Sequence, residues 1–401
     1  MVRNQTAVII TLGALTAIGS LSIDMYLPGF PSIADDLETD VSHVALSLTS
    51  FFVGISAGQL FFGPIIERFG RKIPLLTGLS LYLLASFGCT LTNSVNALII
   101  LRFFQALGGC SGMVISRTMV RDLFPVSETA KIFSLLMLIM GIAPIIAPTL
   151  GGFLAENTGW RSIFILLTAI GGMLLLATAR FLPESKAADK TVALYPAAVI
   201  NRFYVVLKQP MFLTYAIVSG FASAGMFAYI SGSPFVFMKL FGLSETEYGW
   251  LFGLNATGLI AASQLNRVFL KKRTSRDIVV VAASLQVLSG ILLFAGTVTG
   301  LITSITTFVL IFIYLMMQGF VFPNSTALSL EPFEQNAGIA SALAGSMQMV
   351  IAALASAAVS YLHNGTAVPM AMVIAVCTAI SFIILITGRI VISRKFIHSN
   401  A

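Results

Sequence analysis

Long apolar stretches recur along this sequence, and they constrain its fold more than any other feature. A helix needs about 20 mostly apolar residues to cross the hydrocarbon layer of a membrane, and it must satisfy every backbone N–H and C=O internally. We predict twelve such helices, at residues 5–27, 43–65, 74–92, 97–120, 131–155, 161–182, 211–236, 246–268, 277–298, 302–328, 338–362 and 368–391. With 57% hydrophobic and only 10% charged residues, the composition excludes a water-soluble domain.

Basic residues are distributed unevenly between the predicted loops. An even number of spans places both termini on one side, and all but Arg102, Arg161 and Lys239 of the 23 Lys and Arg residues fall at that side or at its helix ends. Because basic residues are retained in the cytoplasm, we expect both termini to be cytoplasmic. The net charge of +7 then reflects membrane topology, and no nucleic-acid partner is expected.

The longest polar interruption divides the spans into two sets of six. It covers residues 183–209, which we expect to form a cytoplasmic central loop between an N-terminal bundle at 1–182 and a C-terminal bundle at 210–401. Transporters are often built from two such halves with the substrate site between them near mid-membrane. The predicted fold class is therefore an all-α membrane protein with two six-helix bundles around a central cavity.

Motifs of metal binding and catalysis are missing from the sequence. Cys89, Cys110 and Cys377 each lie inside an apolar stretch, and the chain contains no CxxC, HExxH or nucleotide-binding G-x-x-x-x-G-K-S/T pattern. We therefore expect no metal, no cofactor and no enzymatic activity, which argues against a membrane-embedded enzyme or a receptor.

The run Gly-Pro-Ile-Ile-Glu-Arg-Phe-Gly-Arg-Lys lies between the second and third predicted spans, at residues 63–72. It resembles the signature loop of the major facilitator superfamily, which implies that superfamily's fold. In the family this loop holds the two halves together on the cytoplasmic side. We call its candidate residues, together with an acidic residue below the fourth span, the latch: Gly63, Glu67, Arg68, Gly70, Arg71, Lys72 and Asp122. The alternative is a solvated basic loop that only obeys topology.

The resemblance also implies partners for two latch residues. Glu67 stands where the family usually has Asp, and it is expected to face the N-terminal end of the eleventh helix, near residues 336–338, where the helix dipole favours a carboxylate. The extra methylene keeps the charge and lengthens the reach. Arg71 is expected to pair with Asp122.

The run Ser-Ile-Asp-Met-Tyr-Leu-Pro at residues 22–28 ends the first predicted helix. It resembles the twelve-helix drug:proton antiporter branch of the superfamily, and within it the bicyclomycin and chloramphenicol resistance subgroup. Asp24 is the acidic residue that we place inside a span, where a carboxylate is costly unless protonated, paired or wetted. We therefore expect Asp24 to carry the coupling proton. In the alternative interpretation it only binds interfacial water at the helix end.

A second run, Leu-Arg-Phe-Phe-Gln-Ala-Leu-Gly-Gly at residues 101–109, resembles the helix-four motif of the superfamily. The family ties its arginine to proton coupling, and the matching residues are Arg102, Gln105 and Gly108. A guanidinium does not deprotonate, so Arg102 is expected to balance Asp24 electrostatically. Snorkelling of Arg102 to the lipid headgroups is the alternative.

Glycines and prolines of the fifth predicted helix resemble the motif that marks antiporters in this superfamily. Paired glycines permit close helix contact, and prolines interrupt the backbone hydrogen bonds and bend the helix. A generic kinked helix is the alternative. The matching residues are Gly141, Pro144, Pro148, Gly151 and Gly152.

Aromatic and amide side chains at mid-span depth are candidates for lining a substrate cavity, because aromatic surfaces adapt to varied ligands. The alternative for each of them is simple packing. The candidates are Tyr26, Tyr229, Phe235, Asn255, Tyr314, Gln318, Asn324 and Gln348.

Taken with the resemblance, these patterns predict a multi-pass protein of the bacterial inner membrane that exports small amphiphilic or neutral compounds. Export of the chloramphenicol or bicyclomycin type is expected to be driven by proton entry, with alternating access to the two sides. The expected partners are drug-like small molecules, protons and membrane lipid, and we expect a monomer. A proton-coupled exporter of one metabolite, such as an amino acid or a sugar, is the alternative.

Overall fold

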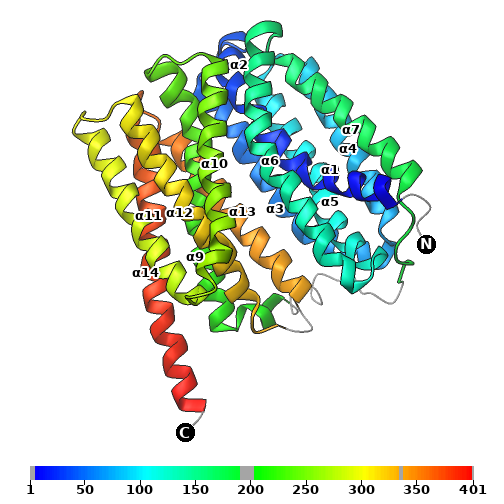
Figure 1. The fold of residues 1–401 in the computed structure, drawn as a ribbon. Helices are drawn as coiled ribbons and strands as arrows, with labels where there is room; N and C mark the ends of the chain where they lie inside the picture. Colours follow the sequence, from blue (N-terminus) through cyan, green and yellow to red (C-terminus); the bar gives the residue numbers. More distant parts are fainter. Residues whose placement is uncertain (1–4, 190–202, 334–336, 400–401) are drawn as a thin grey trace. The chain divides into compact units, whose positions relative to one another are not determined.

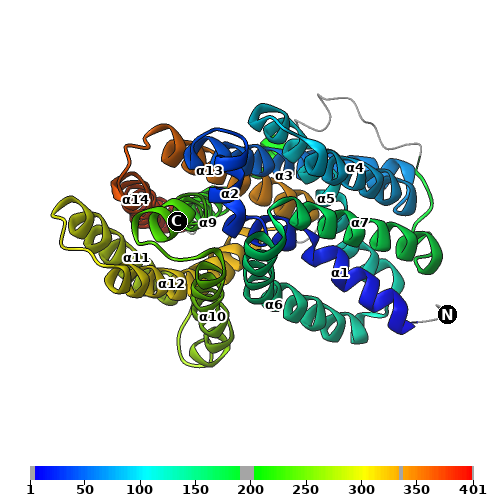
Figure 2. The same cartoon turned by 90° about the horizontal axis from the view of Figure 1, so that it is seen from above.

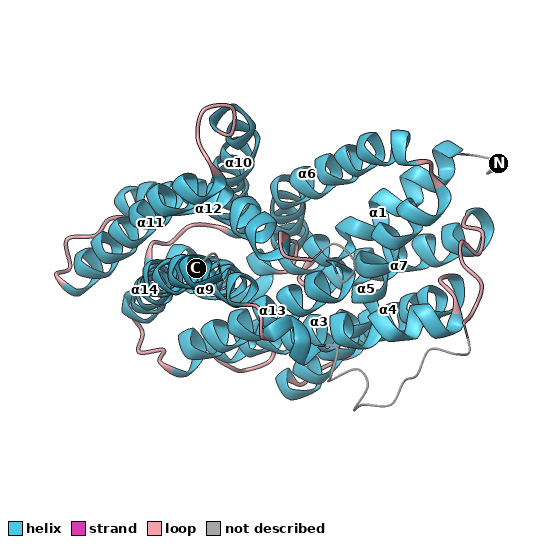
Figure 3. Cartoon of the chain, turned by 90° about the horizontal axis from the view of Figure 1, so that it is seen from below, coloured by secondary structure: helices cyan, strands magenta, loops and turns pink. Residues whose placement is uncertain are grey.

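The structure is a computed structural model that describes residues 5–189, 203–333 and 337–399. Helices account for nearly all of the regular structure in these residues, and no strand occurs among them (Figure 3). The expected all-α membrane fold is confirmed.

In the first half of the chain, the described residues form six long helices and one short one (Figure 1). The helix α1 is interrupted at Met25, and the chain then forms a short 3-10 turn at Leu27–Gly29 and continues into the short α2. Pro28 lies in this turn, where its fixed φ angle suits a tight helix start. The helices are α1 (Gln5–Asp24), α2 (Phe30–Asp36), α3 (Val41–Phe69), α4 (Lys72–Leu91), α5 (Val95–Leu123), α6 (Val126–Thr158) and α7 (Arg161–Phe181).

Six long helices follow in the second half, and a π-helical turn at Phe235–Leu240 extends the first of them. Within the segment expected to be a loop, residues 203–207 are helical, and residues 190–202 lie outside the described part. The helices are α9 (Pro210–Pro234), α10 (Glu245–Phe269), α11 (Ser275–Val298), α12 (Ser304–Leu330), α13 (Ala337–Tyr361) and α14 (Val368–Ser399).

Each predicted span corresponds to one long helix, with differences at the ends. Among the described residues, 11 helices are long and apolar enough to cross a membrane. The one predicted span that is not among these 11, at residues 246–268, corresponds to α10, which has the required length but carries Glu245, Glu247, Asn255, Asn266 and Arg267. These polar residues lower its hydropathy below that of its neighbours.

Helix contacts follow the same pattern in both halves of the sequence. In the first half, α1 packs against α5, α6 and α7, and α4 packs against α5 and α7; Figure 2 shows α1, α6 and α7 side by side. In the second half, α9 packs against α12, α13 and α14, and α11 packs against α12 and α14. Since α9 to α14 take the places of α1 and α3 to α7, the chain contains an internal structural repeat.

The described contacts group the chain into two compact units. Unit 1 comprises Met1–Val199 with Leu243–Gly253, and unit 2 comprises Ile200–Gly242 with Leu254–Ala401. The first turns of α10 therefore belong to unit 1. They pack on α6 closely enough that a side chain at Gly249 would approach the Pro148 carbonyl oxygen to 2.5 Å.

Candidate functional site

The latch is formed where α3 ends and α4 begins. Helix α3 ends at Phe69, and the turn to Lys72 passes through Gly70, whose φ of 82° lies in the left-handed region that favours glycine. This turn places Glu67 on the last turn of α3 and Arg71 just before α4. Asp122 comes from the last turn of α5.

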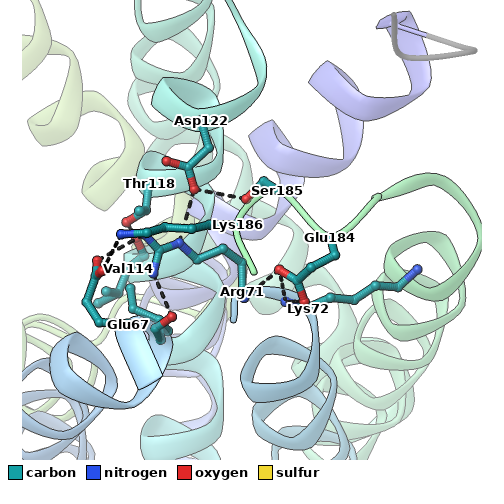
Figure 4. Close-up of polar contacts among 10 residues, drawn as sticks. Glu67, Arg71, Lys72, Val114, Thr118, Asp122, Glu184, Ser185 and Lys186 are labelled. Carbon is teal, nitrogen blue, oxygen red and sulfur yellow. Dashed lines mark hydrogen bonds and ion pairs between the residues drawn. The ribbon is translucent and has the colours of Figure 1, made fainter. Parts of the chain in front are cut away.

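Arg71 is the centre of the latch, and its side chain is only 2% exposed (Figure 4). Its Nε donates to Asp122 Oδ2 at 3.0 Å, so the pairing expected from the sequence is present. Nη2 donates to Glu67 Oε1 at 2.9 Å, and Nη1 donates to the Ile66 carbonyl oxygen at 2.6 Å. One planar guanidinium thus joins α3, α4 and α5, which a lysine at this position would not do.

A second segment, missed at the sequence level, completes the latch. We call residues 184–186, which follow α7, the strap (Figure 4). Glu184 Oε1 accepts a hydrogen bond from the Arg71 backbone N–H at 2.6 Å. Ser185 Oγ donates to Asp122 Oδ2 at 2.9 Å, and Lys186 Nζ pairs with Glu67 Oε2 at 2.6 Å. More than 110 residues of sequence separate Glu184 from Arg71, so no local pattern signals this contact.

The side chains of the other latch candidates take no part in the hydrogen bonds between Arg71 and the two latch carboxylates. A side chain at Gly63 would meet no atom within 4 Å, so this glycine is not required by close packing. The Arg68 guanidinium lies 5.9 Å from the Phe69 ring centroid, and Lys72 Nζ donates to the Ala179 carbonyl oxygen at 3.0 Å. The start of the predicted eleventh helix at residue 336 lies outside the described residues, and α13 begins at Ala337.

Arg102 is the cation of the helix-four motif, and its side chain has no exposed surface. Its Nη1 donates to Gln105 Oε1 at 2.5 Å and its Nη2 to the Ser22 carbonyl oxygen at 2.9 Å. Its Cζ also lies 4.5 Å from the ring centroid of Tyr26 and 4.2 Å from that of Phe51. The interpretation of Arg102 as a snorkelling residue is therefore wrong, because aromatic rings and hydrogen bonds stabilise the buried charge.

Asp24 is the last residue of α1 and is 6% exposed. We expected Arg102 to balance its charge, but no ion pair joins the two among the described residues. The neighbours of Asp24 in the sequence do contact Arg102, Ser22 through its carbonyl oxygen and Tyr26 through its ring. The structure therefore provides a buried carboxylate and a buried cation that do not neutralise each other directly.

Gln105 and Gly108 fix the position of α5 against α4. Gln105 Nε2 donates to Ser86 Oγ at 2.8 Å, which links the Arg102 cluster to α4. A side chain at Gly108 would come within 2.5 Å of the Gly78 carbonyl oxygen and the Tyr82 backbone nitrogen. Only glycine allows the two backbones to approach this closely.

Antiporter-motif residues lie on the continuous helix α6, which contains both Pro144 and Pro148. Gly151 packs against the Met25 backbone, at the break that follows Asp24, and Gly152 packs against the Glu245 backbone at the start of α10. Gly141, nearer the middle of the helix, is partly exposed. Gly151 and Gly152 therefore allow close backbone contacts with α6 at one end of unit 1.

An ionic cluster at the end of unit 1 opposite the latch was also missed at the sequence level. Arg161 Nη1 pairs with Asp36 Oδ2 at 2.6 Å, and Nη2 donates to the Asn93 side chain at 2.8 Å and the Thr92 carbonyl oxygen at 3.1 Å. This arginine joins α2, the α4–α5 turn and α7. The signal in the sequence was that Arg161, unlike most of the basic residues, does not fall at the predicted side of the two termini.

Most of the predicted substrate-lining residues are buried, each within its own unit. Six have at most 2% of their surface exposed and are hydrogen-bonded to neighbours: Tyr26, Tyr229, Asn255, Tyr314, Gln318 and Asn324. A side chain must expose surface to bind a ligand, and these six expose almost none in this structure. Phe235 and Gln348 are partly exposed and remain candidates.

The buried amides form hydrogen bonds with side chains of neighbouring helices. Gln286 Nε2 donates to Gln318 Oε1 at 2.9 Å, and Gln318 Nε2 donates to Ser223 Oγ at 2.8 Å. Asn324 Nδ2 donates to Asn266 Oδ1 at 2.8 Å. Polar groups buried among apolar helices need partners, and here the partners come from neighbouring helices. A partnered amide and a ligand-binding amide look the same in the sequence, so the assignment of these residues to a substrate cavity stays a prediction.

Several bacterial proteins are similar in sequence to nearly the whole chain. An MFS-type transporter of Bacillus subtilis (strain 168), YdgK, is 36% identical over 94% of this chain and 94% of its own length. A bicyclomycin resistance protein homolog of Haemophilus influenzae is 31% identical over 93% of this chain and 94% of its own. The multidrug resistance protein MdtL of Escherichia coli O45:K1 is 27% identical over 97% and 98%, respectively.

Solved transporter structures share the fold. The structure of the nucleoside transporter NupG superposes with a TM-score of 0.72 over 95% of this chain and 99% of that one, at 13% identity. A family model described as Major Facilitator Superfamily matches residues 12–357. This chain belongs to the major facilitator superfamily, and it is therefore a membrane transporter and not an enzyme.

Proposed function

We propose that this chain is a proton-driven exporter of small amphiphilic or neutral compounds, of the chloramphenicol and bicyclomycin type. The names of two relatives support drug export, since one is a bicyclomycin resistance protein homolog and one a multidrug resistance protein. We further propose that it resides in a bacterial inner membrane with both termini and the latch on the cytoplasmic side, as the distribution of basic residues favours.

The single observation that carries proton coupling is the burial of Asp24 without an ion-pair partner among the described residues. A carboxylate in a membrane-spanning bundle is costly when charged and unpaired, so proton uptake lowers its cost. Gly151 packs on the next residue, Met25. Movement of α6 would therefore change the access of water to Asp24, and with it the affinity of Asp24 for a proton.

Energetics favour this direction of transport. One proton that crosses a potential of 100 mV releases about 2.3 kcal/mol. A tenfold concentration gradient of a neutral solute costs about 1.4 kcal/mol. One proton per drug molecule therefore supports a gradient of more than tenfold, and a pH difference adds to it.

Accumulation of radiolabelled chloramphenicol in bacteria tests the proposal. Cells that express the chain are compared with cells that carry the empty vector, before and after a protonophore collapses the gradient. We expect the chain to lower steady-state accumulation severalfold, and the protonophore to abolish the difference. Equal accumulation in the two strains, repeated with bicyclomycin, would exclude export of these compounds and favour a metabolite substrate.

A further inference from the structure

The strap lies against the latch through all three of its residues, and each contact is to a different latch group. Glu184 binds the backbone at the start of α4, Ser185 binds Asp122 and Lys186 binds Glu67. None of the three contacts lies within the strap, since each partner belongs to another segment of unit 1. They join the end of α7 to the ends of α3 and α5.

Glu184 acts as the cap of α4. The first N–H groups of a helix have no acceptor within the helix. Glu184 Oε1 accepts from the Arg71 N–H at 2.6 Å, and Oε2 accepts from the Lys72 N–H at 3.1 Å. Its negative charge is also favourable at a helix N-terminus. Glu184 therefore holds the backbone of the residue that supplies the central guanidinium.

Lys186 occupies the remaining oxygen of Glu67. Arg71 binds Glu67 Oε1 and Lys186 binds Oε2, at 2.9 and 2.6 Å. Both carboxylate oxygens are thus held within unit 1. Before Glu67 binds any group outside this cluster, at least one of these two contacts must break. The contact to Lys186 is the easier one to break, because that side chain is 48% exposed whereas Arg71 is 2% exposed.

We propose that the strap positions the latch: Glu184 holds Arg71 in place, and Lys186 restrains Glu67 until the conformational change of transport. This inference rests on the proposed function for the transport step only. Lys186 would then slow the transition, and Glu184 would set the geometry of the latch without touching the substrate.

Amide hydrogen exchange of the full-length chain in lipid nanodiscs tests the Glu184 contact without any substrate. The N–H groups of Arg71 and Lys72 are protected by Glu184, so Glu184→Ala is expected to raise their exchange rate about three- to tenfold, as for one exposed charge-assisted hydrogen bond. Glu184→Gln keeps a neutral acceptor and should fall between. Glu128→Ala, an exposed glutamate on α6, is the matched control and should leave these amides unchanged.

Proteoliposome flux of chloramphenicol tests the Lys186 contact. Lys186→Ala is expected to raise the maximal rate about two- to fivefold at unchanged KM, since it weakens one exposed ion pair that must break. Lys131→Ala on α6, exposed and on the same side of the chain, is the control. The proposal is overturned if Glu184→Ala exchanges like the unmodified chain, or if Lys186→Ala transports like Lys131→Ala. Absence of flux in the unmodified chain would instead refute the proposed function, and the exchange result would still decide the role of Glu184.

Discussion

Replacement of Arg71 by methionine is the perturbation whose effect the structure specifies most closely. The unbranched methionine side chain retains part of the packing of the arginine stem but removes all three hydrogen-bonded contacts. Two of these are to the carboxylates of Glu67 and Asp122, whose side chains are 40% and 21% exposed and regain water when the arginine is lost. The third leaves the carbonyl oxygen of Ile66 without this donor.

The magnitude follows from these exposures. A partly exposed ion pair contributes at most about 1 kcal/mol, and an unpaired buried carbonyl costs about 1–3 kcal/mol. Together they predict a loss of about 3 kcal/mol in the free energy of unfolding, which corresponds to about 6–12 °C in Tm for a unit of this size.

Thermal unfolding in detergent, followed by tryptophan fluorescence, measures this loss, because Trp160 is 3% exposed in unit 1. Arg121→Met is the control, since the Arg121 guanidinium lies 6.0 Å from the Phe133 ring and has no carboxylate partner among the described residues. Arg71→Lys should fall between the two, as lysine cannot reach all three acceptors. A Tm for Arg71→Met within 1 °C of the Arg121→Met value would refute the reasoning.

Two further predictions test close packing and buried polar contacts. Gly108→Ala should lower the free energy of unfolding by about 1–3 kcal/mol, as overpacking of a helix contact does. Gly63→Ala, in open space, should leave Tm unchanged or raise it. Equal Tm values for the two variants would contradict the close approach of α4 and α5. Gln318→Leu should lower the free energy of unfolding by about 1–3 kcal/mol because Gln286 and Ser223 lose their partner. The double variant Gln286→Leu with Gln318→Leu should cost less than the sum of the single changes. Strict additivity in the same thermal assay would argue against these linked hydrogen bonds.

Much of the fold follows from the sequence because one physical requirement decides it. A segment such as residues 278–298 is mostly apolar and contains no charged side chain, so hydropathy alone predicts a membrane helix there. The break after Asp24 was less predictable. There the turn at Leu27–Gly29 and the short α2 follow from Pro28 and from packing on α6, and hydropathy does not report either of them.

The site was predictable where a motif is local or where the family resemblance implied a pairing, as for Arg71 with Asp122. The loop at residues 63–72 contains both Glu67 and Arg71, so their proximity follows from their short separation in the sequence. The strap and the Arg161 cluster join residues that lie far apart in the chain, and nothing in a single sequence pairs them. Tyr314 and Gln318 illustrate a different limit of the sequence, because a polar side chain in an apolar helix needs a partner, and the sequence does not say whether that partner is a ligand or another helix.

Transport by purified chain in proteoliposomes, with Asp24 replaced by asparagine, tests proton coupling most directly. We expect an imposed pH gradient to drive chloramphenicol accumulation by the unmodified chain and not by Asp24→Asn. Exchange of labelled for unlabelled drug at equal pH, which needs no net proton movement, should survive the substitution. Gradient-driven accumulation by Asp24→Asn at the rate of the unmodified chain would contradict the assignment of Asp24 as the proton carrier.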